Sequence, residues 1–204
     1  MPDLSAVDKP FGLEPWGPVL RARIYAIVTS NAVAVSPGDL MEDVAEAVAT
    51  PKMGVLPKAI PEETGAATSI LGVCLATFDH NFDPCYYIPI TTTGNSVIAG
   101  YALIADHPDQ EYVIQEDGAT SSIQVADMGL NADCVLTHAI TASDNYHSNY
   151  ELDSNTVNTT STLALKIIGV HPEDSISSAG AAGNHCRFIV KVNASYFGAN
   201  ATAV

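Results

Sequence analysis

The chain has 204 residues, enough for one domain with or without an arm, and 47% of them are hydrophobic, which argues against disorder throughout. Its 23 Asp and Glu against eight Lys and Arg give a net charge of −15, and such an acidic protein repels phosphate, which excludes nucleic acid as a partner. No stretch reaches the roughly 18 apolar residues of a membrane span, and the start, MPDLSAVDKPFG, lacks the features of a signal peptide. We therefore expect a cytoplasmic protein, or part of a particle assembled in the cytoplasm.

Residues 1–18 form the first predicted element, an extended arm. Prolines occupy positions 2, 10, 15 and 18, and proline both fixes the backbone and removes a hydrogen-bond donor. Trp16, the only tryptophan, lies in this arm. It either packs back onto the core or anchors the arm to a neighbouring subunit. The arm leads into a single β-rich domain, predicted to cover residues 19–204.

The first predicted strand covers residues 19–28, where apolar and polar side chains alternate. Period two indicates a half-buried strand, and the two faces are as follows: Leu20, Ala22, Ile24, Ala26 and Val28 against Arg21, Arg23 and Tyr25. A short strand at 32–35 follows, closed by the turn SPGD at 36–39. Residues 42–50 permit either a short helix or a strand, and we expect a strand because the surrounding segments are all β.

Seven more segments have the pattern of short strands. They are 69–77, 86–91, 97–105, 111–115, 135–140, 162–170 and 186–193. The last alternates most regularly, and the segments are separated by turns and by polar loops such as 141–161 and 175–184. Many short strands without long helical periodicity predict an all-β fold, an antiparallel β-sandwich or a barrel-like domain with an extended N-terminal arm.

No group of residues has the spacing of a catalytic or metal site. The clusters DHNFD at 79–83 and DHPD at 106–109 hold potential metal ligands, but Asp and Asn beside Pro are also typical of turns. Glu116 and Asp117, ahead of Gly118, indicate a solvated turn rather than a glycosidase pair. His185 and Cys186, as neighbours on a strand, would point to opposite faces. We therefore expect no enzyme activity, no cofactor and no metal.

The four cysteines are predicted to be buried free thiols. Cys74, Cys85, Cys134 and Cys186 form no CxxC motif, so neither a zinc knuckle nor a thioredoxin-like site is indicated. A disulfide framework would require an oxidising compartment.

The charges are distributed unevenly along the chain. Fourteen acids and no basic residue lie between Lys58 and Lys166, so the basic residues fall into two terminal zones. One interpretation is a self-repelling, soluble surface. The alternative hypothesis is that the terminal zones bind a partner while the acidic middle faces solvent. Substituting Arg21 and Arg23 with alanine would then weaken binding without unfolding the domain.

A series of short phrases, in this order, resembles the head decoration (cement) proteins of tailed bacteriophages. The phrases are FGL (11–13), EPWGP (14–18), GDL (38–40), ADHPD (105–109), YVIQED (112–117), GLNAD (129–133), ELDS (151–154), LKIIG (165–169), PED (172–174) and VKVN (190–193). They cover most of the chain. Residues 42–65 match nothing in the family, and ASY at 194–196 replaces the usual polar-aromatic ending.

The resemblance implies a non-enzymatic virion protein on the outer face of the capsid, where it would stabilise contacts between major capsid subunits. Such proteins usually associate around symmetry axes, so a homotrimer is preferred and a homodimer is the alternative. The expected contact residues are Phe11, Trp16, Arg21, Arg23 and Lys191.

Two other functions remain open on the sequence alone. A tail or head-completion protein of a virion would share the composition and differ in copy number and location. A carbohydrate-binding module would need a platform of exposed aromatic rings, which only Tyr86-Tyr87 and the stretch from Tyr146 to Tyr150 could build.

Overall fold

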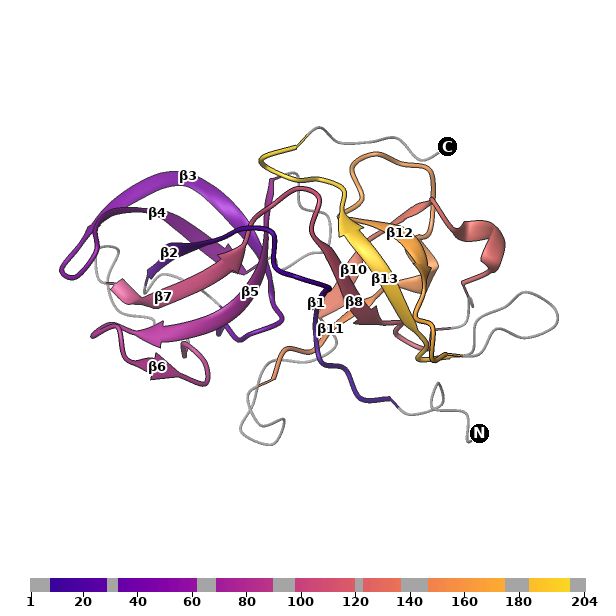
Figure 1. Ribbon diagram of the computed structural model, residues 1–204, viewed down its shortest axis with the longest axis horizontal. Coiled ribbons are helices and arrows are strands. Elements are labelled where there is room, and N and C mark those ends of the chain that lie inside the picture. The colour runs from indigo at the N-terminus through magenta and orange to yellow at the C-terminus, as the bar shows by residue number, and fades with distance from the viewer. Residues whose placement is uncertain are drawn as a thin grey trace.

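The computed structural model describes residues 8–28, 33–61, 69–89, 98–119, 123–136, 147–174 and 184–198. These residues are almost entirely β, with two 3-10 turns, η2 (Val125–Asp127) and η4 (Ser154–Thr156). The strands form two groups side by side (Figure 1), a barrel built from β2 to β7 and a second group built from β1 and β8 to β13. Within these ranges no helix has the length and apolar character needed to cross a membrane. The predicted all-β, sandwich-like fold is confirmed.

The barrel is a ring of five strands with a short sixth strand beside it. Its members are β2 (Ala22–Val28), β3 (Leu40–Thr50), β4 (Gly54–Pro61), β5 (Ile70–Asp79), β6 (Pro84–Cys85) and β7 (Ile98–Ala105). The strand order is β3-β4-β2-β7-β5-β6, and an additional β3–β5 pairing closes the ring. Neighbours are antiparallel except β2 and β4, which pair in parallel through Ala26 and Lys58. Closure satisfies strand edges that would otherwise be open to other chains.

β2 is buried on both faces over its second half, so the prediction of a half-buried strand is wrong there. Tyr25 and Ile27 lie in one buried cluster, while Ala26 and Val28 lie in another, together with Tyr101. The second cluster is covered by side chains of other barrel strands and of the turn after β5, including Val48, Leu56, Phe78 and Phe82. Both faces of β2 are therefore covered, whereas local alternation indicated burial of one face only.

The second group is a five-stranded sheet with a two-stranded hairpin packed beside it. Its members are β1 (Glu14–Trp16), β8 (Glu111–Gln115), β9 (Asn131–Ala132), β10 (Cys134–Leu136), β11 (Tyr150–Leu152), β12 (Leu165–Val170) and β13 (Arg187–Val192). The sheet order is β1-β8-β13-β12-β9, and β10 pairs with β11. The regular alternation predicted for β13 is confirmed, because Phe188, Val190 and Val192 are buried between half-buried neighbours.

One hydrophobic cluster joins the two groups of strands. It contains Leu40, Ile70 and Ala105 from the barrel together with Tyr112 and Phe188 from the second sheet. The chain after β13 also returns to the barrel, where the Ile70 amide donates to the Ala194 carbonyl at 2.9 Å and the Tyr196 amide donates to the Ile70 carbonyl at 2.7 Å. Shared burial and these hydrogen bonds hold the two groups against each other.

Most predicted strands are confirmed, with several differences. The short strands β1, β6, β9 and β11 were not predicted, and β11 lies within the segment 141–161 that was predicted to be a polar loop. The segments predicted at 32–35 and 86–91 show only the bridge between Val35 and Ile88 in their described parts. β10 ends at Leu136, and residues 137–140 lie outside the described residues. β4 was not predicted either, and it contains Pro57 and Pro61, a residue type that is uncommon within strands. None of the four cysteines forms a disulfide, as predicted; three are buried as expected, but Cys85 is only half-buried, which the prediction had wrong.

Candidate partner-binding surface

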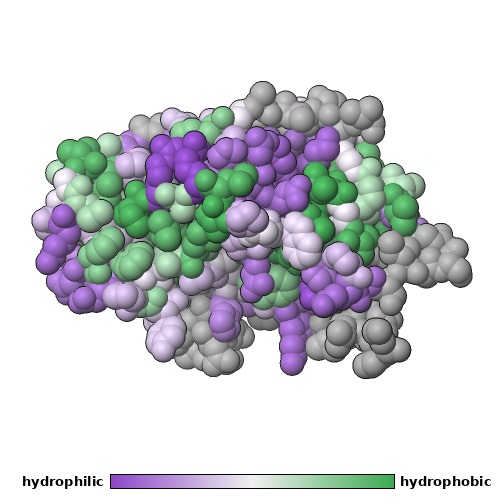
Figure 2. All heavy atoms as spheres, viewed as in Figure 1, coloured by the Kyte–Doolittle hydropathy of each residue, from purple (hydrophilic) through white to green (hydrophobic). Residues whose placement is uncertain are grey.

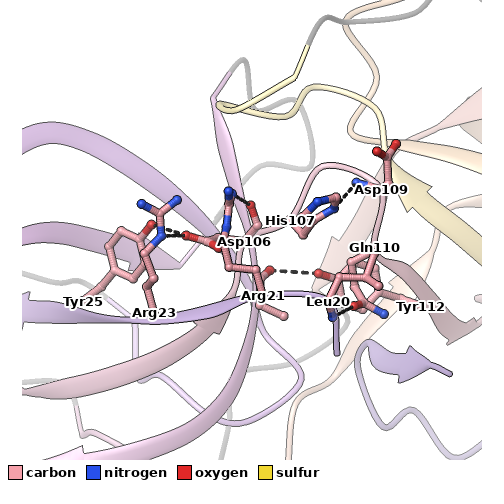
Figure 3. Close-up of polar contacts among 10 residues, drawn as sticks. Leu20, Arg21, Arg23, Tyr25, Asp106, His107, Asp109, Gln110 and Tyr112 are labelled. Atoms are coloured by element: carbon pink, nitrogen blue, oxygen red, sulfur yellow. Dashed lines mark hydrogen bonds and ion pairs between the residues drawn. The ribbon is translucent and has the colours of Figure 1, made fainter. Parts of the chain in front are cut away.

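The candidate surface centres on Asp106, which lies directly after β7 and is fully buried. Its carboxylate accepts hydrogen bonds from Arg21 Nε at 2.6 Å, from Arg23 Nε at 2.5 Å and from the Tyr25 hydroxyl at 2.8 Å (Figure 3). β2 and β7 are antiparallel, with Ala22 opposite Ala105. Since every second residue of a strand points to the same face, the side chains at 21, 23 and 25 converge on one carboxylate.

The contacts of Asp106 fix the two arginines from inside the molecule. Arg21 also donates from Nη2 to the Asp106 carbonyl at 2.6 Å. Burial, followed by the hydrogen bond to Asp106, raises the pKa of Tyr25, so its hydroxyl stays protonated and donates. The two guanidinium groups are therefore held in a fixed orientation at the junction of the barrel and the second sheet.

Aromatic rings from the chain after β13 cover the two arginines. The guanidinium carbons of Arg21 and Arg23 lie 4.9 and 4.6 Å from the centre of the Phe197 ring, within the range of a cation–π interaction. The Tyr196 ring meets Phe197 edge to face at 4.8 Å. We call Leu20, Arg21, Arg23, Tyr196 and Phe197 the seam surface, because they lie where the barrel meets the second sheet.

The seam surface combines exposed apolar groups with charge. Leu20, Tyr196 and Phe197 are exposed although they are large and hydrophobic. Figure 2 shows hydrophobic residues gathered over the barrel half of this face, next to strongly hydrophilic ones. The Leu20 amide donates to Gln110 Oε1 at 2.9 Å (Figure 3), which fixes the backbone that leads into β2. Such a mixture of rigid aromatic and arginine groups is typical of interface hot spots.

Trp16 and Lys191 lie on the second sheet rather than in the seam surface. Trp16 pairs with Glu111, and Glu111 pairs with Lys191, so the three share one row and one face of the sheet. The Trp16 ring is partly exposed and lies 5.1 Å from the ring of His171. Lys191 forms an ion pair with Asp109, in the loop that also contains Asp106. This ion pair links the sheet face to the edge of the seam surface.

Phe11 lies elsewhere, in a groove of about 650 Å³ between the arm and the barrel. Pro37, Leu75 and His147 line the same groove. The five predicted contact residues therefore divide into three sets: Arg21 with Arg23, Trp16 with Lys191, and Phe11 alone.

The arm meets the barrel at the turn before β3. The Leu13 amide donates to the Gly38 carbonyl at 2.9 Å, and the Gly38 amide donates to the Cys74 carbonyl at 2.8 Å. The predicted turn at 36–39 is confirmed, since the Asp39 amide donates to the Ser36 carbonyl. Asp39 is buried beside this contact, and burial raises its pKa from 3.8 to about 7, although hydrogen bonds from Ser36 and Ser148 partly offset the effect.

Asp39 predicts a specific pH dependence of stability. Because the pKa is higher in the folded than in the unfolded chain, the folded state binds the extra proton between about pH 4 and pH 7. The contribution of Asp39 to stability is therefore present below about pH 4 and is lost as the pH rises to about 7. We expect Asp39→Asn to gain at least about 1 kcal/mol relative to the wild type between these limits. Urea unfolding of both proteins at pH 4 to 8 measures this difference. If the free energy of unfolding changed with pH equally in both proteins, the expectation would be contradicted.

The clusters considered as metal ligands are turns, as predicted, with one exception. Asp79 Oδ1 accepts from the amides of Asn81 at 2.7 Å and Asp83 at 3.0 Å. His107 Nδ1 accepts from the Asp109 amide at 3.1 Å (Figure 3). Asp106 differs, because its side chain points to the arginines instead of its own turn.

The prediction of a solvated turn at Glu116 and Asp117 is wrong. Glu116 is buried, and its Oε2 accepts from the His185 amide at 2.8 Å. Asp117 Oδ1 accepts from the Ser154 hydroxyl at 2.8 Å. His185 precedes β13 with a left-handed φ of 59°, so the strand geometry assumed for it is also wrong. Long-range packing against the segment around Ser154 buries what looked like a local turn.

The sequence argument missed Asp106, Tyr196 and Phe197. The two aromatics follow directly after the last strand, and this adjacent pair was the signal available in the sequence. Asp106 had no such signal, because its role depends on the pairing of β2 with β7.

No protein-family model matches the chain, and no curated protein or solved structure is significantly similar to it. The candidate surface is therefore defined by the contacts and exposure of this chain's own residues.

Proposed function

We propose that the protein is a non-enzymatic structural protein of a tailed-phage virion, which binds the outer surface of the capsid and stabilises contacts between major capsid subunits. Two observations support the proposal. The ordered phrases that resemble decoration proteins extend over most of the chain, from residue 11 to residue 193. The seam surface then presents two arginines and two aromatic rings on a β framework, and this is the single structural observation that carries the proposal.

The seam surface is suited to protein binding because its polar groups are already ordered. Arg21 and Arg23 are held by Asp106 and covered by Phe197. Side chains that are fixed before binding lose less conformational entropy when a partner docks. Arg and Tyr are also the residue types that contribute most to binding energy at interfaces. The partner is the major capsid protein, and the location is the exterior of the virion.

The charge and the predicted oligomer fit the same function. A net charge of −15 keeps a capsid exterior soluble and away from DNA. We propose a homotrimer, with a homodimer as the alternative, because closed symmetry suits a site on a symmetry axis. Repeated display on a lattice strengthens weak single contacts through effective concentration.

The carbohydrate-binding alternative loses support, while the other virion role remains. Tyr86 is 84% exposed, but Tyr150 is buried and contributes no ring to a platform, while Tyr146 lies outside the described residues. A tail or head-completion protein would present the same kind of surface and is distinguished by the number of copies in each particle.

Copy number in purified particles tests the proposal. We expect a simple lattice ratio to the major capsid protein, with hundreds of copies in each particle. Quantitative mass spectrometry measures the ratio, with a protease that cuts after Glu or Asp, because trypsin has no site between Lys58 and Lys166. A dozen copies or fewer would assign the protein to the tail or portal, and absence from particles would overturn a virion role.

A matched pair of variants then tests the seam surface. Leu20 is 52% exposed in the seam, and Val55 is 71% exposed at the tip of the β3–β4 hairpin. We expect Leu20→Ser to lower occupancy of capsids lacking the protein by about fivefold or more, since covering the exposed half of a leucine side chain is worth about 1 kcal/mol. Val55→Ser removes a comparable exposed group outside the seam and is expected to bind normally. Equal binding of both variants would remove the seam surface from the interface.

A further inference from the structure

We infer that Asp8, Glu151 and His185 form a binding site for a divalent transition-metal cation. Asp8 lies in the N-terminal arm, Glu151 on β11 and His185 two residues before the start of β13. One carboxylate oxygen from each acid and one imidazole nitrogen lie within 4.8 Å of one another. Three segments that are distant in the sequence thus bring three metal-ligand groups to one point.

The donor set selects the class of ion. Zn²⁺ binds imidazole nitrogen and carboxylate oxygen at about 2.0–2.2 Å, so ligand atoms on one ion lie about 3–4 Å apart. A small closure of the side chains from within 4.8 Å reaches this spacing. Imidazole with carboxylates suits Zn²⁺ or Mn²⁺, whereas Ca²⁺ and Mg²⁺ prefer sites made of oxygen alone. Three protein ligands leave a further position for water.

His185 is held rigidly in this position. Its amide donates to Glu116 Oε2 at 2.8 Å, and its carbonyl accepts from Gln115 Nε2 at 3.0 Å. Its ring lies so close to Gly118 that a Cβ at position 118 would be 2.5 Å from the imidazole Nε2. The protein therefore fixes both the backbone and the ring of the proposed ligand.

An unpaired polar atom of His185 independently points to a missing ligand. His185 Nδ1 is shielded from solvent and has no hydrogen-bond partner. Buried nitrogen and oxygen atoms are nearly always hydrogen-bonded, so an exception requires an explanation. Two buried acids lie near His185: Glu151 belongs to the proposed site, and Glu116 accepts from the His185 amide. A cation bound by this ring nitrogen would give it a partner and would offset the negative charges of Asp8 and Glu151.

A bound ion would fasten the arm to the second group of strands. Asp8 is exposed and precedes Lys9, whose amide donates to Gln115 Oε1 at 3.0 Å. Coordination of Asp8 together with Glu151 on β11 and His185 before β13 would hold this part of the arm in place. The role is independent of the proposed capsid function and is tested on the isolated protein.

Isothermal titration calorimetry with ZnCl₂, MnCl₂ and CaCl₂ tests the site on the full chain. We expect one Zn²⁺ or Mn²⁺ per chain and much weaker binding of Ca²⁺. Asp8→Asn, Glu151→Gln and His185→Asn should each weaken binding by at least about 100-fold, since even outer-shell changes cost 10- to 100-fold. Asn tolerates the left-handed φ of position 185. His80→Asn, at an exposed histidine outside the site, is the matched control and should bind as the wild type does.

Absence of saturable Zn²⁺ or Mn²⁺ binding would overturn the inference, and so would equal affinity in the three site variants. If Glu151→Gln or His185→Asn fails to fold, Asp8→Asn still tests the site, because Asp8 is exposed. Hydrogen exchange at the Lys9 amide is a second readout. We expect Zn²⁺ to slow it in the wild type and to leave it unchanged in Asp8→Asn, and an equal effect in both proteins would contradict the site.

Discussion

Replacing both Arg21 and Arg23 with alanine is expected to lower the free energy of unfolding by about 3 kcal/mol. The double variant leaves the fully buried Asp106 carboxylate with Tyr25 as its remaining side-chain donor. Breaking a buried ion pair from one side costs about 3–5 kcal/mol, and we expect the lower value because the arginine side chains are 38% and 47% exposed. Urea unfolding followed by circular dichroism measures the change.

Two further variants separate the cause of this loss. Lys191→Ala breaks the ion pair with Asp109, whose side chain is largely exposed, and is expected to change the stability little. Adding Asp106→Asn to the double variant removes the uncompensated charge and should recover part of the lost stability. A double variant as stable as Lys191→Ala would show that the arginines contribute little to folding.

This expectation changes how the arginines are tested for partner binding. The sequence suggested that alanine at positions 21 and 23 would weaken docking without unfolding the domain. Because both side chains pair with Asp106, a binding defect in that variant would mix destabilisation with lost contacts. Leu20→Ser is the cleaner test of the same surface, since the Leu20 side chain is half exposed.

Gly12→Ala is expected to cost about 3 kcal/mol or more and to displace the arm from the barrel. Gly12 has a φ of +74°, and an added Cβ would overlap the Ser148 hydroxyl and lie 2.6 Å from the Gly38 carbonyl oxygen. A left-handed conformation costs a non-glycine residue about 1–2 kcal/mol, and overpacking adds about 1–3 kcal/mol. Urea unfolding measures the stability, and hydrogen exchange of the Leu13 amide reports whether the arm remains docked.

Gly17→Ala is the matched control in the same arm. Gly17 has a similar φ of +80°, but an added Cβ would have no atom within 4 Å. Only the conformational cost of about 1–2 kcal/mol is therefore expected. If the two variants were equally stable, close packing of the arm on the turn at 36–39 would not contribute to the fold.

Local patterns in the sequence predicted the strands that follow simple alternation. β8 covers the residues predicted for it, and β13 buries every second side chain as expected. β3 is a strand, as its surroundings indicated. β4 was not predictable in this way, because Pro57 and Pro61 each remove a backbone donor. These prolines are tolerated because β4 pairs with β3 on one side and has only a single pairing with β2 on the other.

Composition and local patterns were enough to predict the class of the fold, the turns at 36–39 and 79–83, and the acidic character of the protein. These properties depend on residue type and on spacing of a few positions, which short-range sterics and hydrogen bonding control. Three features could be seen only once the chain was folded: Arg21 and Arg23 pair with Asp106, Glu116 is buried, and Asp8, Glu151 and His185 lie together. Each of these depends on which strands pair and pack, and contacts between residues tens of positions apart leave no periodic signal in the sequence.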